Sequence, residues 1–199
     1  MIIRSQGVPT TDILENMAVL HCEAMPSSRV SQLSKKAISA LYKFAASSAS
    51  ERLIWIENES SDLIGLAFLS FFPSTLGMHA SLVSPFAIGI SLTWALVRRL
   101  LHPEIRARAS TPGASGSPEG PELLFFAVSK ASRGKGVGEK LLGELECLLQ
   151  AENVRQYYLR TDNMPGNRAI TFYARSGFTV LENHKGPQIF LRKSVIKTE

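Results

Sequence analysis

The sequence predicts a mixed α/β fold, and two observations carry that prediction. First, segments rich in β-branched and aromatic residues alternate with segments in which apolar residues recur at helical spacing. Second, residues 123–150 hold a buried strand, a glycine-rich turn and an amphipathic helix in direct succession. The chain has 199 residues, enough to bury a sizeable core, and we expect one domain over residues 1–199.

The first half of the chain predicts an edge strand, two helices and a β-hairpin. Glu15 follows Asp12 at the spacing of an N-cap and its capping partner, which predicts that the first helix starts at Asp12. Pro26 then ends this helix. The expected segments are residues 2–4 for the strand, about 12–23 and 31–46 for the helices, and 51–58 with 63–72 for the hairpin.

A long insert, residues 73–121, separates this hairpin from the next strand. Its apolar part predicts a helix at about residues 85–101, with an uninterrupted apolar run that is shorter than the roughly 18 residues of a membrane span. We expect this helix to be buried or to face a partner, which includes a second copy of the chain; the alternative is a helix on a membrane surface. Residues 109–121 are mostly small residues, Gly and Pro, and predict a flexible loop.

The second half of the chain alternates strands and helices and closes with a hairpin. The complete order is then β-α-α-β-β-(insert)-β-α-β-α-β-β, which is a mixed-sheet α/β layout. The expected segments are the strand at 123–128, the helix from about Val137, the strand at 154–161, the helix at 168–176, and the hairpin strands at 178–182 and 188–192.

The glycine-rich turn between strand and helix has the features of a phosphate-binding site. Gly134, Gly136 and Gly138 let a ligand approach the backbone, and the first turn of the following helix presents unpaired N–H groups and its positive dipole end. Two nucleotide-binding patterns do not fit. The Rossmann pattern needs a glycine where Glu139 stands, and a P-loop needs Lys-Ser/Thr where Glu139-Lys140 follows the last glycine.

Two segments resemble the GNAT superfamily of N-acetyltransferases. Residues 133–138 (RGKGVG), after the strand FFAV, resemble its (Q/R)xxGx(G/A) acyl-CoA-binding turn, and residues 169–178 (AITFYARSGF) are similar to its AxxxYxxxGF segment. The resemblance implies a GNAT-like mixed, mainly antiparallel sheet with helices on both faces. The insert at 73–121 departs from the family, because it lies between the third and fourth strands, where a short turn is usual.

The resemblance also implies a reaction: transfer of an acetyl group from acetyl-CoA to a primary amine by direct attack in a ternary complex. In the family the strand backbone holds the pantetheine arm and polarises the thioester carbonyl, which here points to Phe126, Ala127 and Val128. The turn amides hold the pyrophosphate. The residues that correspond to this turn are Arg133, Gly134, Lys135, Gly136, Val137 and Gly138.

Tyr173 matches the family's tyrosine, which donates toward the departing thiolate. Full proton transfer from a phenol of pKa ~10 to a thiol of pKa ~8.5 is uphill by about 2 kcal/mol, so we expect hydrogen-bond donation. Gly166 stands where the family often has an asparagine that holds the pantetheine. Asn167, ranked above Asn163, is the expected substitute.

The acceptor is expected to be a small amine of low pKa. Neutralising a lysine-like amine at pH 7 costs about 4.6 kcal/mol, against about 1.4 kcal/mol for an α-amine, and no general base stands out. An amino sugar or a peptide N-terminus is therefore favoured. The alternatives are a non-catalytic CoA-binding or interaction module and a protein N-terminal or lysine acetyltransferase. The candidates for a base, all open, are His21, Glu23, Glu57 and Asp162.

Charge and composition narrow the class of protein further. The net charge of +5 favours an anionic ligand such as coenzyme A, and the absence of any nucleic-acid module signature argues against a nucleic-acid partner. The histidines show no metal-ligand spacing, so no metal is expected. Cys22 and Cys147 read as small core residues in a reducing compartment, and residues 1–7 lack signal-peptide features. These features predict a cytoplasmic protein without a transmembrane segment.

Overall fold

The computed structural model describes residues 1–5, 7–26, 28, 30–76, 118–181 and 187–195. The helix expected at about 85–101 and most of the loop expected at 109–121 lie outside the described residues. The internal structure of the connection between the third and fourth strands therefore stays a prediction. Its position between those strands agrees with the sequence.

The described strands form one sheet of seven strands in the order β1-β2-β3-β4-β5-β7-β6. All neighbouring pairs are antiparallel except β4 and β5, which are parallel, so the predicted mixed and mainly antiparallel sheet is confirmed. The strands are β1 (Ile2–Arg4), β2 (Glu51–Glu57), β3 (Leu63–Ser70), β4 (Glu122–Val128), β5 (Gln156–Asp162), β6 (Thr179–Val180) and β7 (Gln188–Ser194).

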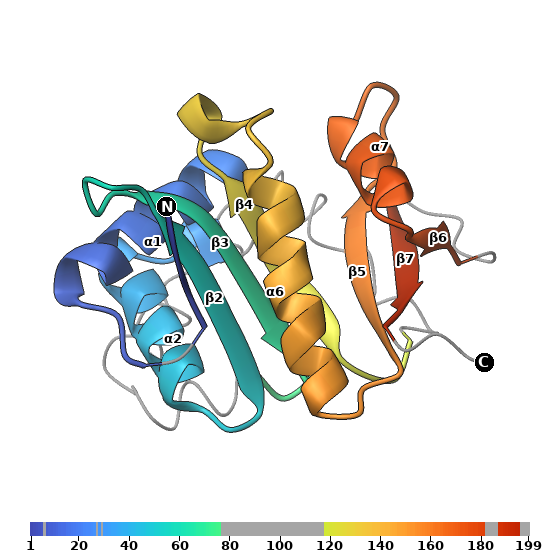
Figure 1. Ribbon diagram of the computed structural model, residues 1–199, viewed down its shortest axis with the longest axis horizontal. Coiled ribbons are helices and arrows are strands. Elements are labelled where there is room, and N and C mark those ends of the chain that lie inside the picture. The colour runs from blue at the N-terminus through green and yellow to red at the C-terminus, as the bar shows by residue number, and fades with distance from the viewer. Residues whose placement is uncertain (6, 27, 29, 77–117, 182–186, 196–199) are drawn as a thin grey trace, which may run out of the picture.

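Helices cover both faces of the sheet, as predicted (Figure 1). The apolar stripe of α6 packs on one face, together with Tyr173 from α7, and α1 and α2 pack on the other. The helices are α1 (Thr11–Ala24), α2 (Lys35–Ser47), α6 (Val137–Ala151) and α7 (Arg168–Arg175), with short 3-10 turns η1 (Val30–Gln32) and η3 (Lys130–Ser132).

Two local expectations are wrong. The N-cap of α1 is Thr10, whose hydroxyl accepts a hydrogen bond from the Ile13 N–H at 3.4 Å, and Asp12 lies in the first turn instead. Both residue types cap helices well, so the pattern alone did not decide between them. Cys147 is exposed rather than buried among the leucines, because it lies on the solvent side of α6.

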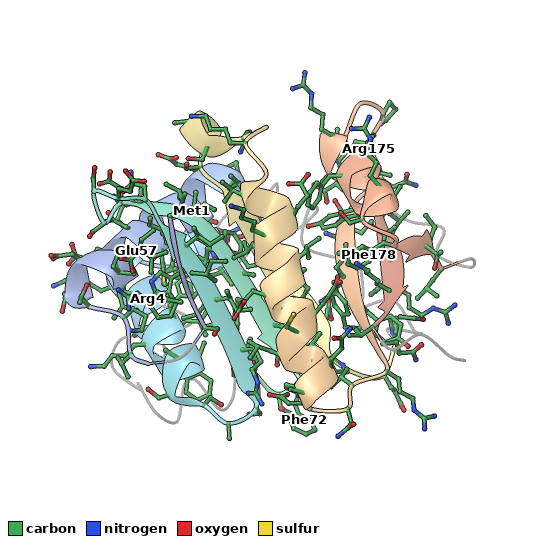
Figure 2. The ribbon with its side chains drawn as sticks, viewed as in Figure 1. Met1, Arg4, Glu57, Phe72, Arg175 and Phe178 are labelled. Atoms are coloured by element: carbon green, nitrogen blue, oxygen red, sulfur yellow. The ribbon has the colours of Figure 1, made fainter. Side chains whose placement is uncertain are left out.

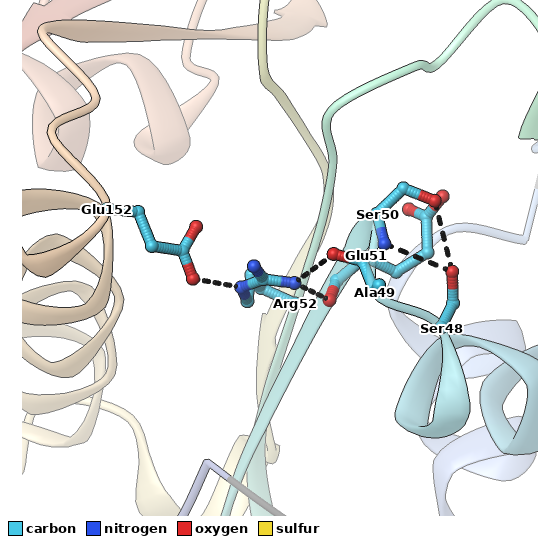
Figure 3. A network of polar contacts seen from close by, with 6 residues as sticks. All are labelled: Ser48, Ala49, Ser50, Glu51, Arg52 and Glu152. Carbon is cyan, nitrogen blue, oxygen red and sulfur yellow. Dashed lines mark hydrogen bonds and ion pairs between the residues drawn. The ribbon is translucent and has the colours of Figure 1, made fainter.

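A buried carboxyl group lies at the start of β2. Glu51 is 3% exposed, and neither carboxylate oxygen has a hydrogen-bond partner. Its neighbour Arg52 points elsewhere: the guanidinium donates to Glu152 at 2.6 Å and to the Ala49 carbonyl at 2.8 Å (Figure 3). Burial raises the pKa of Glu51 to about 7, since a charge there would lose its hydration.

The Glu51→Gln variant is therefore expected to gain stability over the wild type as the pH rises. The raised pKa means that the protonated carboxyl stabilises the fold fully below about pH 4.5, and this contribution is lost as the pH rises through about 7. Urea unfolding from pH 4.5 to 8 should show the variant gaining on the order of 2 to 3 kcal/mol relative to wild type. A difference that stays constant across this range would contradict the assignment.

Candidate active site

The two central strands, β4 and β5, are paired only at their beginning. Glu122 lies opposite Tyr158 and Leu123 opposite Leu159, and the ladder between the strands ends there. Beyond this point β4 continues along β3 and β5 continues along β7. The strands thus separate toward their carboxyl ends, with α6 and α7 on the two sides of the opening (Figure 1).

A β-bulge in β4 lies at the start of this opening. Phe68 of β3 is opposite Phe125 and Leu69 is opposite Leu123, which leaves Leu124 without a cross-strand partner. As a result Leu124 and Phe125 both contact the cluster under α1 and α2, although neighbouring residues of a strand normally face opposite sides. Because of the bulge, Phe126 and Val128 pack in the cluster under α6, as Leu123 does before the bulge.

The last residues of β4 direct peptide groups into the opening. The Ser129 N–H donates to the Ile64 carbonyl of β3 at 3.0 Å, so by strand alternation Ala127 also pairs with β3. Phe126 and Val128 then turn their N–H and C=O groups to the edge that β5 has left. Of the three backbone positions predicted to hold the pantetheine, two face the opening and Ala127 faces away.

The glycine turn follows β4 and η3 directly. Arg133 folds back, and its Nε donates to the Val128 carbonyl at 3.2 Å. Gly134 and Gly136 have φ angles of +73° and +75°, the left-handed region that glycine adopts without strain. A Cβ atom on either would meet nothing within 4 Å, so both border open space. Gly136 is also the N-cap of α6, whose first amides have no partner inside the helix.

Gly138 has a different role from the other two glycines. A Cβ atom there would lie 3.1 Å from two ring carbons of Phe172, so the glycine allows α6 and α7 to pack closely. The Phe172 ring stacks on Phe126 of β4 with the ring centroids 5.7 Å apart. The two segments that matched the family pattern therefore meet in space, through Gly138, Phe172 and Phe126.

Tyr173 lies at this meeting point. It is 7% exposed, and its ring packs against Phe126 at 6.1 Å, Phe172 at 5.4 Å and Phe178 at 5.3 Å between ring centroids. Burial raises the pKa of the Tyr173 phenol well above its usual value, so the group stays protonated over the physiological range. The phenol is a hydrogen-bond donor on a ring that contacts Phe126, whose peptide groups face the opening.

The structure assigns Asn167 to the helix terminus. Its side-chain oxygen accepts from the Ala169 N–H at 3.0 Å, and its amide nitrogen donates to the Thr161 hydroxyl at 3.1 Å and to the Asp162 carbonyl at 2.8 Å. The oxygen thus caps α7, and the amide nitrogen donates to the last residues of β5. The contact of Asn167 with the pantetheine stays a prediction, and it would replace one of these two donated bonds.

Three of the four candidates for a general base make other contacts. His21 is buried, its Nδ1 lies 2.6 Å from the Tyr42 hydroxyl, and its ring stacks on Phe125. Burial lowers the pKa of His21 to about 4, so it is neutral at pH 7. Glu57 accepts from the Trp55 indole at 2.7 Å. The remaining candidates are Glu23, which is exposed, and Asp162, which accepts from Gln188 at 3.3 Å.

A groove of about 540 Å³ runs between α6 and α7, next to the glycine turn. It is a mixed-charge groove that the sequence reasoning missed. The seven-residue spacing of Arg168 and Arg175, which places both on one face of a helix, was the available signal. Its lining residues are Glu139, Leu142, Gly143, Glu146, Arg168, Thr171, Phe172, Arg175, Ser176 and Lys193.

The sequence predicted neither a metal site nor a transmembrane segment, and the following findings concern the residues that the structure describes. Within those residues, no group of three or more His, Cys, Asp or Glu side chains is placed to hold a metal ion. Within the same residues, no helix is both long and apolar enough to span a membrane.

Comparison with known proteins gives a match to one family model. Residues 105–180, which include β4, the glycine turn, α6, β5 and α7, match the family model described as the acetyltransferase (GNAT) domain. Over these residues the chain resembles the GNAT acetyltransferase domain. Among curated proteins, no sequence matches it. The predicted resemblance to this superfamily is thereby confirmed.

Solved structures share the GNAT fold over nearly the whole chain. An aminoglycoside 6'-N-acetyltransferase complexed with coenzyme A is 14% identical with a TM-score of 0.63, covering 100% of this chain and 99% of that one. A GNAT-family acetyltransferase from Staphylococcus aureus Mu50 is 12% identical with a TM-score of 0.61, covering 98% and 100%. The PaiA N-acetyltransferase from Thermoplasma acidophilum, also in complex with coenzyme A, is 14% identical with a TM-score of 0.57, covering 98% and 99%. At these identities the likeness establishes the fold.

Proposed function

We propose that this GNAT domain transfers an acetyl group from acetyl-CoA to the primary amine of a small molecule. The observation that carries the proposal is the opening between β4 and β5, which adjoins the glycine turn at the N-terminus of α6. Two proteins of the same fold are known in complex with coenzyme A, which supports the same cosubstrate here.

The described residues suit each part of this cosubstrate. The peptide groups of Phe126 and Val128 would pair with the amides of the pantetheine arm, as a further strand would. The left-handed turn and the first amides of α6 would take the pyrophosphate, for which helix N-termini are suited. Arg168 and Arg175 line the adjoining groove together with Glu139 and Glu146, and the two arginines would add positive charge near the phosphates.

The proposed reaction is a direct substitution at the thioester carbonyl. The neutral amine attacks the carbonyl carbon, the C–N bond forms, the C–S bond breaks, and the surplus proton of the amine leaves to solvent. A peptide N–H of β4 that faces the opening stabilises the developing oxyanion, an effect commonly worth about 3 kcal/mol. Tyr173 donates a hydrogen bond to the departing thiolate. Its raised pKa makes complete proton transfer still less favourable and supports donation as its role.

The acceptor is proposed to be an amine of low pKa, with an amino sugar as the favoured class. Because α6 and α7 occupy one face of the sheet, the acceptor would approach the thioester from the face that α1 and α2 cover. The likeness to an aminoglycoside acetyltransferase supports this class. The free cysteines fit a reducing compartment, and we propose the cytoplasm as the location.

Release of the CoA thiol across a panel of amines tests this function. We expect thiol release from acetyl-CoA with amino sugars, and weaker release with a peptide N-terminus and with a lysine side chain. Calorimetry on the same protein measures acetyl-CoA binding separately. Binding without turnover of any amine would favour the alternative, a non-catalytic CoA-binding module, whereas faster turnover of peptides would favour a protein acetyltransferase.

A further inference from the structure

The opening between β4 and β5 divides the sheet into two arms. We call β1 to β4 with α1, α2 and α6 the N-terminal arm, and β5 to β7 with α7 the C-terminal arm. Among the strands that the structure describes, two paired positions join the arms. We propose that two largely buried carboxylates, Glu122 and Glu146, fix how far the arms open and are positioning residues for acetyl-CoA. This inference rests on the proposed function.

The first bridge lies where the ladder between the arms ends. Glu122 is the first residue of β4 and is 7% exposed. Arg160 of β5 donates through Nε to its Oε1 at 2.6 Å and through Nη2 to its Oε2 at 3.4 Å. The guanidinium also lies 5.5 Å from the centre of the Phe190 ring of β7. Arg160 comes one residue after the last paired position of β5, so this ion pair closes the vertex of the opening.

The second bridge lies on the opposite face of the sheet. Glu146 of α6 accepts at its Oε1 from the Tyr157 hydroxyl of β5 at 2.9 Å and from the Lys193 ammonium of β7 at 2.5 Å. Lys193 also lies 5.7 Å from the centre of the Phe178 ring. Figure 2 shows Phe178 below Arg175, on the side of the molecule that holds α7 and β5. One carboxylate of the N-terminal arm therefore holds two strands of the C-terminal arm.

The two bridges lie on opposite faces because neighbouring residues of a strand point to opposite sides. Leu123 and Leu159 pack in the cluster under α6, so Glu122 and Arg160, next to them in sequence, face the side of α1 and α2. Glu146 lies on α6 itself. With one bridge on each face, rocking of the arms in either direction about the short ladder would stretch one of them.

The width of the opening matters because the proposed binding groups sit on different arms. The peptide groups of Phe126 and Val128 belong to the N-terminal arm, and Tyr173 belongs to the C-terminal arm. A single ligand can contact both only at one separation, and small misplacements of such groups have large effects on binding and rate. The carboxylates would set that separation without touching the ligand.

A distance measurement tests the inference without any ligand. Spin labels at Lys140→Cys on α6 and Ala174→Cys on α7, both exposed positions, are compared in a Cys22→Ala, Cys147→Ser background. We expect one narrow distance distribution in this parent protein and a broader one after Glu122→Gln or Glu146→Gln. Distributions that match the parent would overturn the proposal.

Glu152→Gln is the matched control. It breaks the Arg52–Glu152 ion pair, which also measures 2.6 Å and joins α6 to β2 within the N-terminal arm (Figure 3). The distance distribution should stay narrow in this variant. Arg160→Lys, which keeps the charge but loses the two-pronged contact with Glu122, gives a milder test if Glu122→Gln does not fold.

Calorimetry with acetyl-CoA tests whether the separation of the arms affects the affinity for the cosubstrate. We expect the Kd for acetyl-CoA to rise about tenfold in Glu122→Gln and Glu146→Gln and to change little in Glu152→Gln. The comparison is made between variants that lose the same amount of thermal stability. Equal losses of affinity in all three variants would mean that the carboxylates only stabilise the fold in general, and this result would overturn the proposal. If wild type itself gives no heat, the proposed function fails, while the distance measurement still decides how the arms are held.

Discussion

Replacing Gly136 by valine is expected to abolish acetyl-CoA binding, with Kd raised more than about 100-fold. The φ angle of +75° is strained for any residue with a Cβ atom, most of all a β-branched one, by roughly 1–2 kcal/mol. The new side chain would also project into the open space beside the first amides of α6, where we propose that the pyrophosphate binds. Calorimetry with acetyl-CoA measures the loss.

Gly7→Val is the matched control for backbone strain. Gly7 also has a left-handed φ, of +96°, and a Cβ atom there would meet nothing within 4 Å, but it precedes α1, outside the site. We expect a similar loss of stability in the two variants and a loss of affinity in Gly136→Val alone. If Gly136→Val binds acetyl-CoA as tightly as Gly7→Val does, the pyrophosphate does not lie on this turn.

Tyr173→Phe is expected to lower kcat about 100-fold with little change in KM for acetyl-CoA. The ring would remain packed among Phe126, Phe172 and Phe178, so the variant removes the donor and keeps the aromatic cluster. Removing a single well-placed donor commonly costs this much in rate. Steady-state rates of CoA release, at saturating amine, measure the effect.

The pH dependence gives a second check on Tyr173. Because burial raises the pKa of its phenol, the protonated donor persists below that raised value, and its ionisation should cause no fall in kcat up to about pH 10. Tyr158→Phe is the control for the Tyr173→Phe substitution. It also removes a tyrosine hydroxyl, one that accepts from Gln156 at 2.7 Å. Unchanged turnover in Tyr173→Phe would remove this residue from the reaction.

The parts of the site that the sequence predicted are local in the chain. The glycine turn lies directly between a strand and a helix, and the Tyr173 segment forms a helix in the predicted place. Each is defined by residues within about ten positions of one another, so the backbone propensities and spacing of one segment are enough to find it. That both segments meet at Phe126 follows only from the fold.

The features that the sequence did not predict depend on contacts between distant residues. The bulge at Leu124 is set by the register with β3, and nothing in the local sequence marks it. The ion pair of Glu122 with Arg160 joins residues 38 positions apart. Asn167 is a further example: its ligand role was predicted from a family position, whereas its contacts with Thr161 and Asp162 of β5 and with the start of α7 follow only from the fold.

The close approach of α6 and α7 at Gly138 couples two steps of the proposed reaction. A methyl group at this position would press on the Phe172 ring, which is adjacent to Tyr173 in the chain and in contact with it. Helix α6, which would bind the pyrophosphate of the cosubstrate, therefore also affects the position of the Tyr173 phenol near the sulfur. We therefore expect that a larger residue at Gly138 would change both the binding of the carrier and the placement of the phenol, even though Gly138 itself has no side chain.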